Sequence, residues 1–406
     1  MSYTIAMLSV HTSPLDMPGS TKDAGGMNVY MRELALELGR RHINVDIFTL
    51  WVHPHLPQIV SLAPHVRVIH IQAGPQEPVH KNALLAYVPT FADKIDEFAR
   101  NHAQQYDVIH SHYWLSGAAA MLLAERWAIP HVTMFHTLAR MKQLANPNEP
   151  EPQQRLDMEQ RIAESVDRMI AATAEEASHI CHICAIPAER VVTIPCGVNL
   201  DLFVPHDRFK VRTQLGLDLH QPVLLFAGRL DPFKGPDILL QAASMMEQDA
   251  QIVVVGGKPG EDKDLRKLES LASDLHISSR VQFFGAQPQS MLPLFYSAAD
   301  VTVVPSYHES FGLVAVESLA CGTPVVATRA GGLMMVVRHD ETGFLLPRCP
   351  AHFAARLDML VRDPMLRARM RAAARRSVLR YSWQHVASQV EHVYDELVED
   401  KRYVEV

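Results

Sequence analysis

Short apolar runs alternate with amphipathic stretches of helical length along most of the chain, a pattern typical of parallel-sheet α/β proteins. In the first half this pattern predicts strands over Ile5–Val10, Val45–Trp51, Val66–Ile71, Val108–His112, His131–Phe135, Arg168–Ala172 and Val191–Ile194. A second series is expected over Val223–Ala227, Ile252–Gly256, Val281–Phe284, Val301–Val304 and Val325–Thr328. Helices should lie between the strands, for example over Gly26–Arg41 and Leu115–Trp127. The chain therefore reads as α/β, with two doubly wound, Rossmann-like domains.

The domain boundary is expected within 195–205, a segment rich in turn-forming and apolar residues. At 406 residues the chain is long for one core and sufficient for two. We expect one domain over 1–198 and a second over 199–380. The amphipathic stretch 381–406 is expected to form a C-terminal helix that packs back on the first domain.

Composition narrows the class of protein. The net charge of −7, from 38 basic and 45 acidic residues, does not favour a nucleic-acid partner. No apolar run reaches membrane-spanning length. The five cysteines are odd in number and lie mostly in apolar surroundings, which favours a reducing cytoplasm. A homodimer is compatible with the sequence, which does not define the oligomeric state.

Two carboxylates mark a candidate ligand site in E-S-F-G-L-V-A-V-E, where Glu309 and Glu317 bracket a predicted helix start at Gly312. Free N–H groups at a helix start can bind an anion. The glutamates can accept hydrogen bonds from hydroxyls. A ligand with both hydroxyls and phosphates, such as a nucleotide sugar, suits this arrangement, whereas an isolated pair of glutamates is more often two solvated residues.

A basic motif, L-L-F-A-G-R-L-D-P-F-K-G, lies about eighty residues before the glutamate motif. Its predicted strand ends at Gly228, and Arg229 and Lys234 follow. A guanidinium and an ammonium suit a diphosphate, and ligands of open α/β sheets bind beyond the carboxyl ends of strands. Near the amino terminus, the loop 11–30 carries Asp23-Ala24-Gly25-Gly26 at a helix start. It lacks G-x-G-x-x-G, so it does not predict nicotinamide binding.

D-A-G-G-M-N-V-Y, H-T-L-A-R-M-K, G-R-L-D-P-F-K-G and E-S-F-G-L-V-A-V-E occur in this order. Together they resemble the retaining glycosyltransferases of family 4, over almost the whole chain. The resemblance implies the GT-B fold, in which two Rossmann-like domains face a cleft. The opening H-T-S-P-L and D-A-G-G-M-N most resemble members that move N-acetylglucosamine from UDP-N-acetylglucosamine to inositol phosphate.

The resemblance also implies roles for individual residues. For the UDP-sugar donor it implies Gly26, Gly228, Arg229, Lys234, Glu309, Phe311, Gly312, Leu313 and Glu317. His136, Arg229, Lys234 and Glu309 are the expected catalytic residues. For the acceptor it implies Lys81, Tyr113, Thr137 and Arg155, whose two cations and two hydroxyls suit a phosphate.

The expected reaction is transfer from a UDP-sugar with retention at the anomeric carbon, to a small phosphorylated polyol or sugar. No cofactor is expected, and no metal, because no D-x-D carboxylate pair is evident. Other acceptors stay open: a fructose phosphate, as in sucrose-phosphate synthesis, or a lipid-linked or polymeric glycan. A dinucleotide-dependent oxidoreductase and a catalytically silent nucleotide-sugar sensor are the alternatives from other classes.

Overall fold

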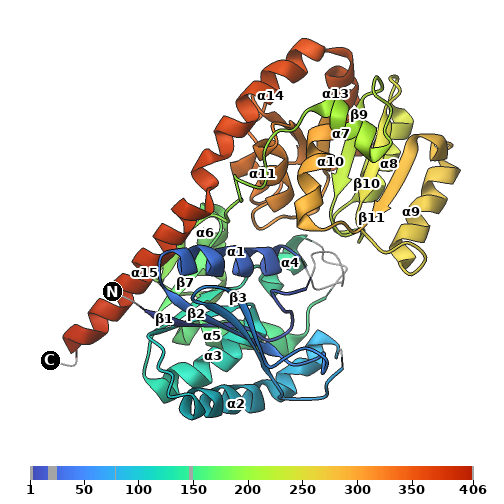
Figure 1. Ribbon diagram of the computed structural model, residues 1–406. Coiled ribbons are helices and arrows are strands. Elements are labelled where there is room, and N and C mark those ends of the chain that lie inside the picture. Colours follow the sequence, from blue (N-terminus) through green and yellow to red (C-terminus); the bar gives the residue numbers. More distant parts are fainter. Residues whose placement is uncertain (1–2, 17–24, 78, 146–149, 405–406) are drawn as a thin grey trace. The chain divides into compact units, whose positions relative to one another are not determined.

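The computed structural model describes residues 3–16, 25–77, 79–145 and 150–404. It contains two compact units (Figure 1). Unit 1 is formed by Met1–Asp16, Gly26–Pro195 and Trp383–Val406, and unit 2 is built on Cys196–Ser382. The C-terminal helix thus belongs to the unit that contains the amino terminus.

Unit 1 is built on an 8-stranded sheet of order β3-β4-β2-β1-β5-β6-β7-β8. The strands are β1 (Thr4–Ser9), β2 (Asn44–Leu50), β3 (Ile59–Ala63), β4 (Val66–Ile71), β5 (Val108–His112), β6 (His131–Met134), β7 (Arg168–Ala171) and β8 (Val191–Thr193). All neighbours pair in parallel except β3 with β4. The strand β3 was not predicted, because its residues lie at the sheet edge and none is buried.

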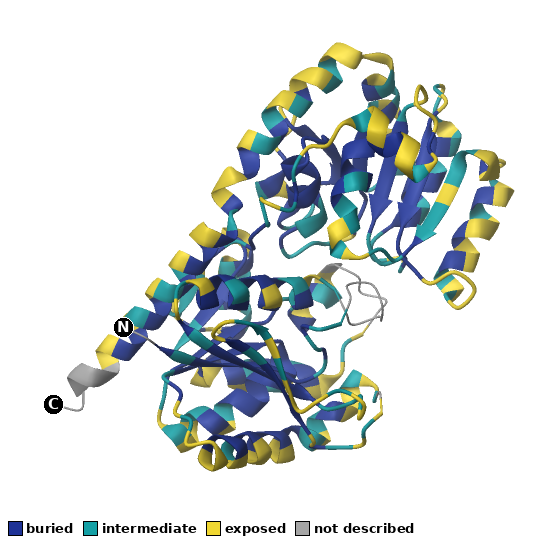
Figure 2. Ribbon diagram, viewed as in Figure 1, coloured by how far each residue is buried: buried dark blue, intermediate teal, exposed yellow. Residues whose placement is uncertain are grey.

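Helices cover both faces of this sheet. They are α1 (Gly26–Arg40), η1 (Lys81–Tyr87), α2 (Val88–Asn101), α3 (Trp114–Trp127), α4 (Ala139–Ala145), α5 (Gln153–Ser165), α6 (Ala174–Cys184), η2 (Ala188–Arg190) and α15 (Trp383–Val404). Helix α1 lies on one face beside α15, and α2 and α3 pack together on the other (Figure 1). The central strands are buried on both sides (Figure 2), which explains their nearly continuous apolar sequences.

Unit 2 contains a 6-stranded parallel sheet of order β11-β10-β9-β12-β13-β14. Its strands are β9 (Val223–Ala227), β10 (Gln251–Val255), β11 (Val281–Gly285), β12 (Val301–Val304), β13 (Val325–Thr328) and β14 (Gly343–Leu346). Its helices are α7 (Arg208–Leu215), α8 (Pro236–Met245), α9 (Lys263–Asp274), η3 (Ser278–Arg280), η4 (Gln289–Met291), α10 (Leu292–Ala298), α11 (Leu313–Ala320), α12 (Leu333–Val336), α13 (Pro350–Arg362), α14 (Pro364–Val378) and η5 (Leu379–Tyr381). The predicted strands of both units are confirmed to within a residue or so at either end. The strand β14 was missed.

Strand order identifies where each unit can bind a ligand. In unit 1, β1 lies between β2 and β5, and in unit 2, β9 lies between β10 and β12. At such a point successive connections leave the sheet in opposite directions, so the carboxyl ends of the two strands border an open crevice. The switch points are therefore the ends of β1 and β5, and the ends of β9 and β12.

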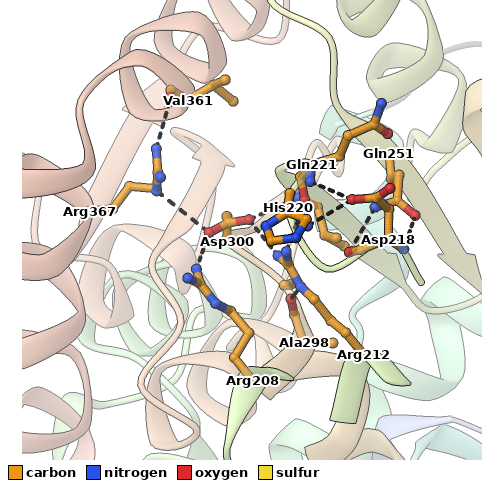
Figure 3. A network of polar contacts seen from close by, with 12 residues as sticks. Arg208, Arg212, Asp218, His220, Gln221, Gln251, Ala298, Asp300, Val361 and Arg367 are labelled. Carbon is orange, nitrogen blue, oxygen red and sulfur yellow. Dashed lines mark hydrogen bonds and ion pairs between the residues drawn. The ribbon is translucent and has the colours of Figure 1, made fainter. Parts of the chain in front are cut away.

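A buried cluster of charged side chains around Asp300 holds the amino ends of β9 and β12 together (Figure 3). The Asp300 carboxylate accepts hydrogen bonds from Arg208 Nη1 at 2.6 Å, Arg212 Nη2 at 2.7 Å and the Val223 amide at 2.9 Å. Arg367 Nε lies 3.5 Å from the same carboxylate. One anion thus ties α7, α14 and the starts of two strands together.

Among the described residues no helix is long and apolar enough to cross a membrane. All five cysteines are free thiols.

Removing the charge of Asp300 should destabilise unit 2. In Asp300→Asn, three guanidinium groups would surround a neutral amide, and loss of one partner of a buried ion pair costs about 3–5 kcal/mol. For a unit of this size we expect the thermal midpoint to fall by on the order of 10 °C, measured by calorimetry. The control is Asp249→Asn, because Asp249 is 80% exposed beside Arg280 and should shift the midpoint little. Equal shifts in both variants would contradict this account.

Candidate functional site

The predicted donor residues of unit 2 gather at its switch point. Gly228 and Arg229 follow β9 directly, and Glu309 follows β12. Arg229 is partly exposed and its Nε lies 3.3 Å from Asp231 Oδ2. Lys234 ends the β9 loop just before α8, and its ammonium donates to Glu309 Oε1 at 2.7 Å. The structure therefore joins the basic motif to the first glutamate, 75 residues further along.

The contacts of Glu309 favour its carboxylate form. Burial alone would raise the pKa of the Glu309 carboxyl, but the ammonium of Lys234 and the hydroxyl of Ser306 outweigh it and hold this pKa below its usual value. Ser306 Oγ donates to the same carboxylate oxygen at 2.8 Å. The result is a fixed ammonium beside a fixed carboxylate.

Glycine backbone makes this pairing sterically feasible. At Gly235, with φ +73°, a side chain would collide with the Pro305 carbonyl, and at Gly331, with φ +49°, with the Glu309 carbonyl. The Gly332 amide donates to that Glu309 carbonyl at 2.7 Å. Sequence analysis did not single out Gly331 and Gly332, although two consecutive glycines after a predicted strand are a recognisable signal.

Arg348 is a further residue that sequence analysis missed. Its Nε donates to the Pro305 carbonyl at 3.0 Å and its Nη2 to the Pro232 carbonyl at 3.3 Å, and its guanidinium lies 3.6 Å from the centre of the Tyr307 ring. It thereby ties the β9 loop to the segment that follows β12. The only sequence signal was an arginine just after an unpredicted strand.

The second half of the glutamate motif lies on α11. Gly312, with φ +97°, is the N-cap, so the amides of Leu313 and the next residues lack helical acceptors. Phe311 is buried, and its ring packs edge-on against Tyr381. Glu317 is buried and accepts a hydrogen bond from Tyr296 Oη at 2.8 Å. The structure thus places Glu317 deeper than Glu309.

In unit 1 the structure brings three of the four predicted acceptor residues together. Arg155 lies 4.8 Å from the centre of the Tyr113 ring and donates from Nη2 to the Thr137 carbonyl at 2.6 Å. These contacts do not include Lys81, which begins η1. Arg155 is buried and also donates to Glu159 at 2.7 Å and Glu151 at 2.9 Å. Arg155 therefore acts as a hub of this cluster rather than as an exposed cation.

Backbone strain marks the ends of β5 and β6. Tyr113 has φ +74° and ψ +158°, a region adopted almost only by glycine, and His136 has φ +59°. Both are predicted site residues. Strain of this kind persists only where the surrounding structure enforces it, and it concentrates at functional sites.

Four histidines lie on or just beyond β5 and β6: His110 and His112 on β5 and His131 at the start of β6 are buried, and His136, after the end of β6, is half-buried. Burial is the largest cause that lowers the pKa of His110, His131 and His136 to about 3, and it holds the pKa of His112 well below its usual value. His110 Nδ1 lies 2.7 Å from Tyr394 Oη on α15. These imidazoles are neutral at physiological pH. Sequence analysis singled out only His136.

The remaining predictions on unit 1 concern the first loop and metals. Gly26 begins α1, whereas Asp23 and Ala24 of its motif lie outside the described residues. Across the described ranges, no group of three or more His, Cys, Asp or Glu side chains is placed to hold a metal ion.

Two Rossmann-like units with charged groups at their switch points define an α/β protein with a candidate site in each unit, and comparison with known proteins specifies the class. The family model "Glycosyltransferase Family 4" matches residues 24–202, and "Glycosyl transferases group 1" matches residues 207–377. A D-inositol 3-phosphate glycosyltransferase of Xylanimonas cellulosilytica is 43% identical over 400 residues, covering 96% of each chain. That of Geodermatophilus obscurus is 42% identical, covering 98% of this chain and 90% of the relative.

Solved structures agree on the fold. The sucrose-phosphate synthase of Thermosynechococcus elongatus is 32% identical with a TM-score of 0.92, covering 98% of this chain and 100% of that one. Anabaena Alr3699/HepE, solved in complex with UDP and glucose, has a TM-score of 0.77 at 22% identity, covering 97% and 100%, and shows the fold alone. The chain belongs to glycosyltransferase family 4. It is a hexosyltransferase with the GT-B fold, as predicted.

Acid should unfold unit 1 through its buried histidines. Because their pKa values are depressed, they contribute stability that is present above pH 6.5 and is lost as pH falls toward 3, by on the order of a few kcal/mol per histidine. All four tryptophans lie in unit 1, so their fluorescence should report this loss.

In His131→Gln the midpoint of this transition should move to lower pH, because one proton fewer is taken up. His392→Gln is the control, since His392 is largely exposed on α15. A midpoint that is the same in wild type and both variants would exclude the histidines as the cause.

Proposed function

We propose that the protein transfers a hexose from a UDP-sugar, with retention at the anomeric carbon, to a small phosphorylated acceptor, with D-inositol 3-phosphate as the first candidate. The observation that carries the proposal is the ion pair of Lys234 and Glu309 at the switch point of unit 2, next to the start of α11. A nucleoside diphosphate sugar carries both kinds of group that such a pair can bind.

On the donor side, Arg229, Lys234 and the first amides of α11 would stabilise the charge that develops on the departing diphosphate. Glu309 would accept hydrogen bonds from hydroxyls of the transferred sugar, and the deeper Glu317 from the ribose. Gly26, Gly228 and the amides of Phe311 and Leu313 complete the proposed donor set. His136 would contact the donor sugar.

The proposed mechanism needs no protein nucleophile. In front-face attack, the oxygen of the acceptor hydroxyl bonds to the anomeric carbon as the bond to the diphosphate breaks on the same face. The hydroxyl proton passes to the departing phosphate oxygen. Glu309 already accepts hydrogen bonds from Lys234 and Ser306, so its carboxylate is poorly suited to form a glycosyl-enzyme bond. None of the proposed residues requires a metal.

On the acceptor side, the relatives named for D-inositol 3-phosphate match this chain at 40–43% identity over almost its whole length. The sucrose-phosphate synthase likeness favours a second candidate, a fructose phosphate. Both candidate acceptors carry a phosphate. Lys81 and Arg155 would supply the cations that a phosphate needs, and Arg155 would also orient Tyr113 and the Thr137 backbone.

Removing the ammonium of Lys234 should impair donor use. Charge-assisted hydrogen bonds contribute about 1.5–3 kcal/mol, so we expect Lys234→Ala to lower kcat/KM for a UDP-sugar by roughly tenfold to a hundredfold. Arg229→Ala should act in the same direction. Lys267→Ala is the matched control, since Lys267 also pairs with a carboxylate in unit 2, but on exposed α9. Normal turnover and normal UDP affinity in both site variants would refute the assignment.

Acceptor choice should depend on the phosphate. With UDP-N-acetylglucosamine and UDP-glucose as donors, we expect transfer to D-inositol 3-phosphate and none to free inositol. Lys81→Ala should raise the acceptor KM by roughly tenfold or more and spare slow donor hydrolysis, whereas Lys94→Ala on exposed α2 should change neither. Preference for a fructose phosphate would favour the second candidate. Use of a neutral glycan alone would refute the phosphorylated acceptor and leave the donor assignment standing.

A further inference from the structure

Two of the four histidines on or just beyond β5 and β6, His112 and His136, form a direct pair. His112 Nδ1 lies 3.0 Å from His136 Nε2, a hydrogen-bond distance. The Tyr30 ring packs edge-on against both imidazoles, at 5.2 Å from His136 and 5.7 Å from His112. Both rings are therefore held by neighbours on β5, β6 and α1, and the pair has one defined geometry.

The surroundings of His112 decide which ring donates the hydrogen. Its other nitrogen, Nε2, is buried with no hydrogen-bond partner among the residues that the structure describes. If His136 donated, a neutral His112 would carry its hydrogen on Nε2 and bury an N–H without an acceptor, which proteins avoid. If His112 donates from Nδ1, only a lone pair is left at Nε2. The second arrangement is favoured, and it places the hydrogen of His136 on Nδ1.

Neither ring is expected to ionise in the working range of the enzyme. Among the described residues, the titratable groups near His136 include His112 and His110 from β5, His11 beyond β1 and the Tyr30 phenol from α1. Burial, then His11, lowers the pKa of His136 to about 3. A neutral imidazole at this position serves as a fixed N–H donor rather than as an acid or a base.

We propose that His112 is a positioning residue that holds His136 as the neutral Nδ1–H tautomer, so that His136 offers a hydrogen bond to a hydroxyl of the transferred sugar. The last step rests on the proposed function, whereas the tautomer does not. The left-handed backbone of His136 fits this role, because φ +59° fixes the direction in which its ring leaves the strand end.

The tautomer can be measured without any substrate. In full-length protein labelled with nitrogen-15 histidine, two-bond proton–nitrogen correlations distinguish the Nδ1–H from the Nε2–H form, and His136→Gln identifies the signal. We expect a single Nδ1–H form from pH 6 to 8 in the wild type, and a mixture or a changed form in His112→Leu. An Nε2–H form in the wild type, or an unaltered signal in His112→Leu, would overturn the proposal.

Kinetics then tests the consequence. His112→Leu should lower kcat at least tenfold while the Kd for UDP stays within about twofold. His112→Asn should recover most of kcat, since its amide nitrogen lies near the place of Nδ1. His131→Leu is the matched control, because it also removes a buried histidine that bonds its neighbours, and its kcat should stay near wild type. An equal loss in His131→Leu, or no recovery in His112→Asn, would indicate a merely structural effect.

A wild type that uses no UDP-sugar but keeps the Nδ1–H signal would refute the proposed function and leave the tautomer standing.

Discussion

The geometry of unit 2 depends on the close approach of two strand ends. Where β9 and β12 run side by side, the loop after β9 must pass against the backbone after β12, and only glycine at Gly235 leaves room. Gly331, in the loop after β13, allows a second close approach, to the Glu309 backbone. The contact at Gly235 places the ammonium of Lys234 on the carboxylate of Glu309. Arg348 bonds both backbones and prevents them from separating, and at the opposite ends of the strands Asp300 holds the same two elements. The two strands that precede the charged pair are therefore held together at both of their ends.

In unit 1, the chain also adopts left-handed backbone beyond two strand ends, but the residues there are not glycine. Tyr113 and His136 adopt left-handed backbone directly beyond two neighbouring strands, at a cost of order 1–3 kcal/mol each. Compensation comes from packing: Arg155 lies on the Tyr113 ring, and Tyr30 and His112 confine His136. Because the strain is offset by contacts of unit 1 itself, these side chains are already oriented before any substrate arrives.

The fold was largely predictable from the sequence, and the site only in part. Strands such as Val223–Ala227 are apolar on both faces and bounded by glycine or proline, so periodicity locates them. Edge strand Ile59–Ala63 lacks that signature, and Gly343–Leu346 begins with a glycine and contains no β-branched residue. Lys234 and Glu309 were recognisable because each follows a predicted strand. The partners of Arg155, the burial of Glu317 on Tyr296 and the pairing of His112 with His136 depend on side-chain contacts between distant segments, which no local pattern encodes.

In each unit, the positive and negative side chains of the candidate site nearly balance. The near-zero net charge affects which ligands the site suits. Lys234 offsets Glu309 in unit 2, and Arg155 and Lys142 offset Glu151 and Glu159 in unit 1. An isolated cation would attract any anion, whereas an ion pair binds best a ligand that presents acceptors to the ammonium and donors to the carboxylate. The lysine ammonium has three N–H groups, of which one reaches Glu309, and a carboxylate accepts from several donors. Phosphate beside hydroxyl is the combination that satisfies both. Under the proposed function, the pair would therefore prefer a sugar nucleotide to a simple phosphate by geometry rather than by net charge.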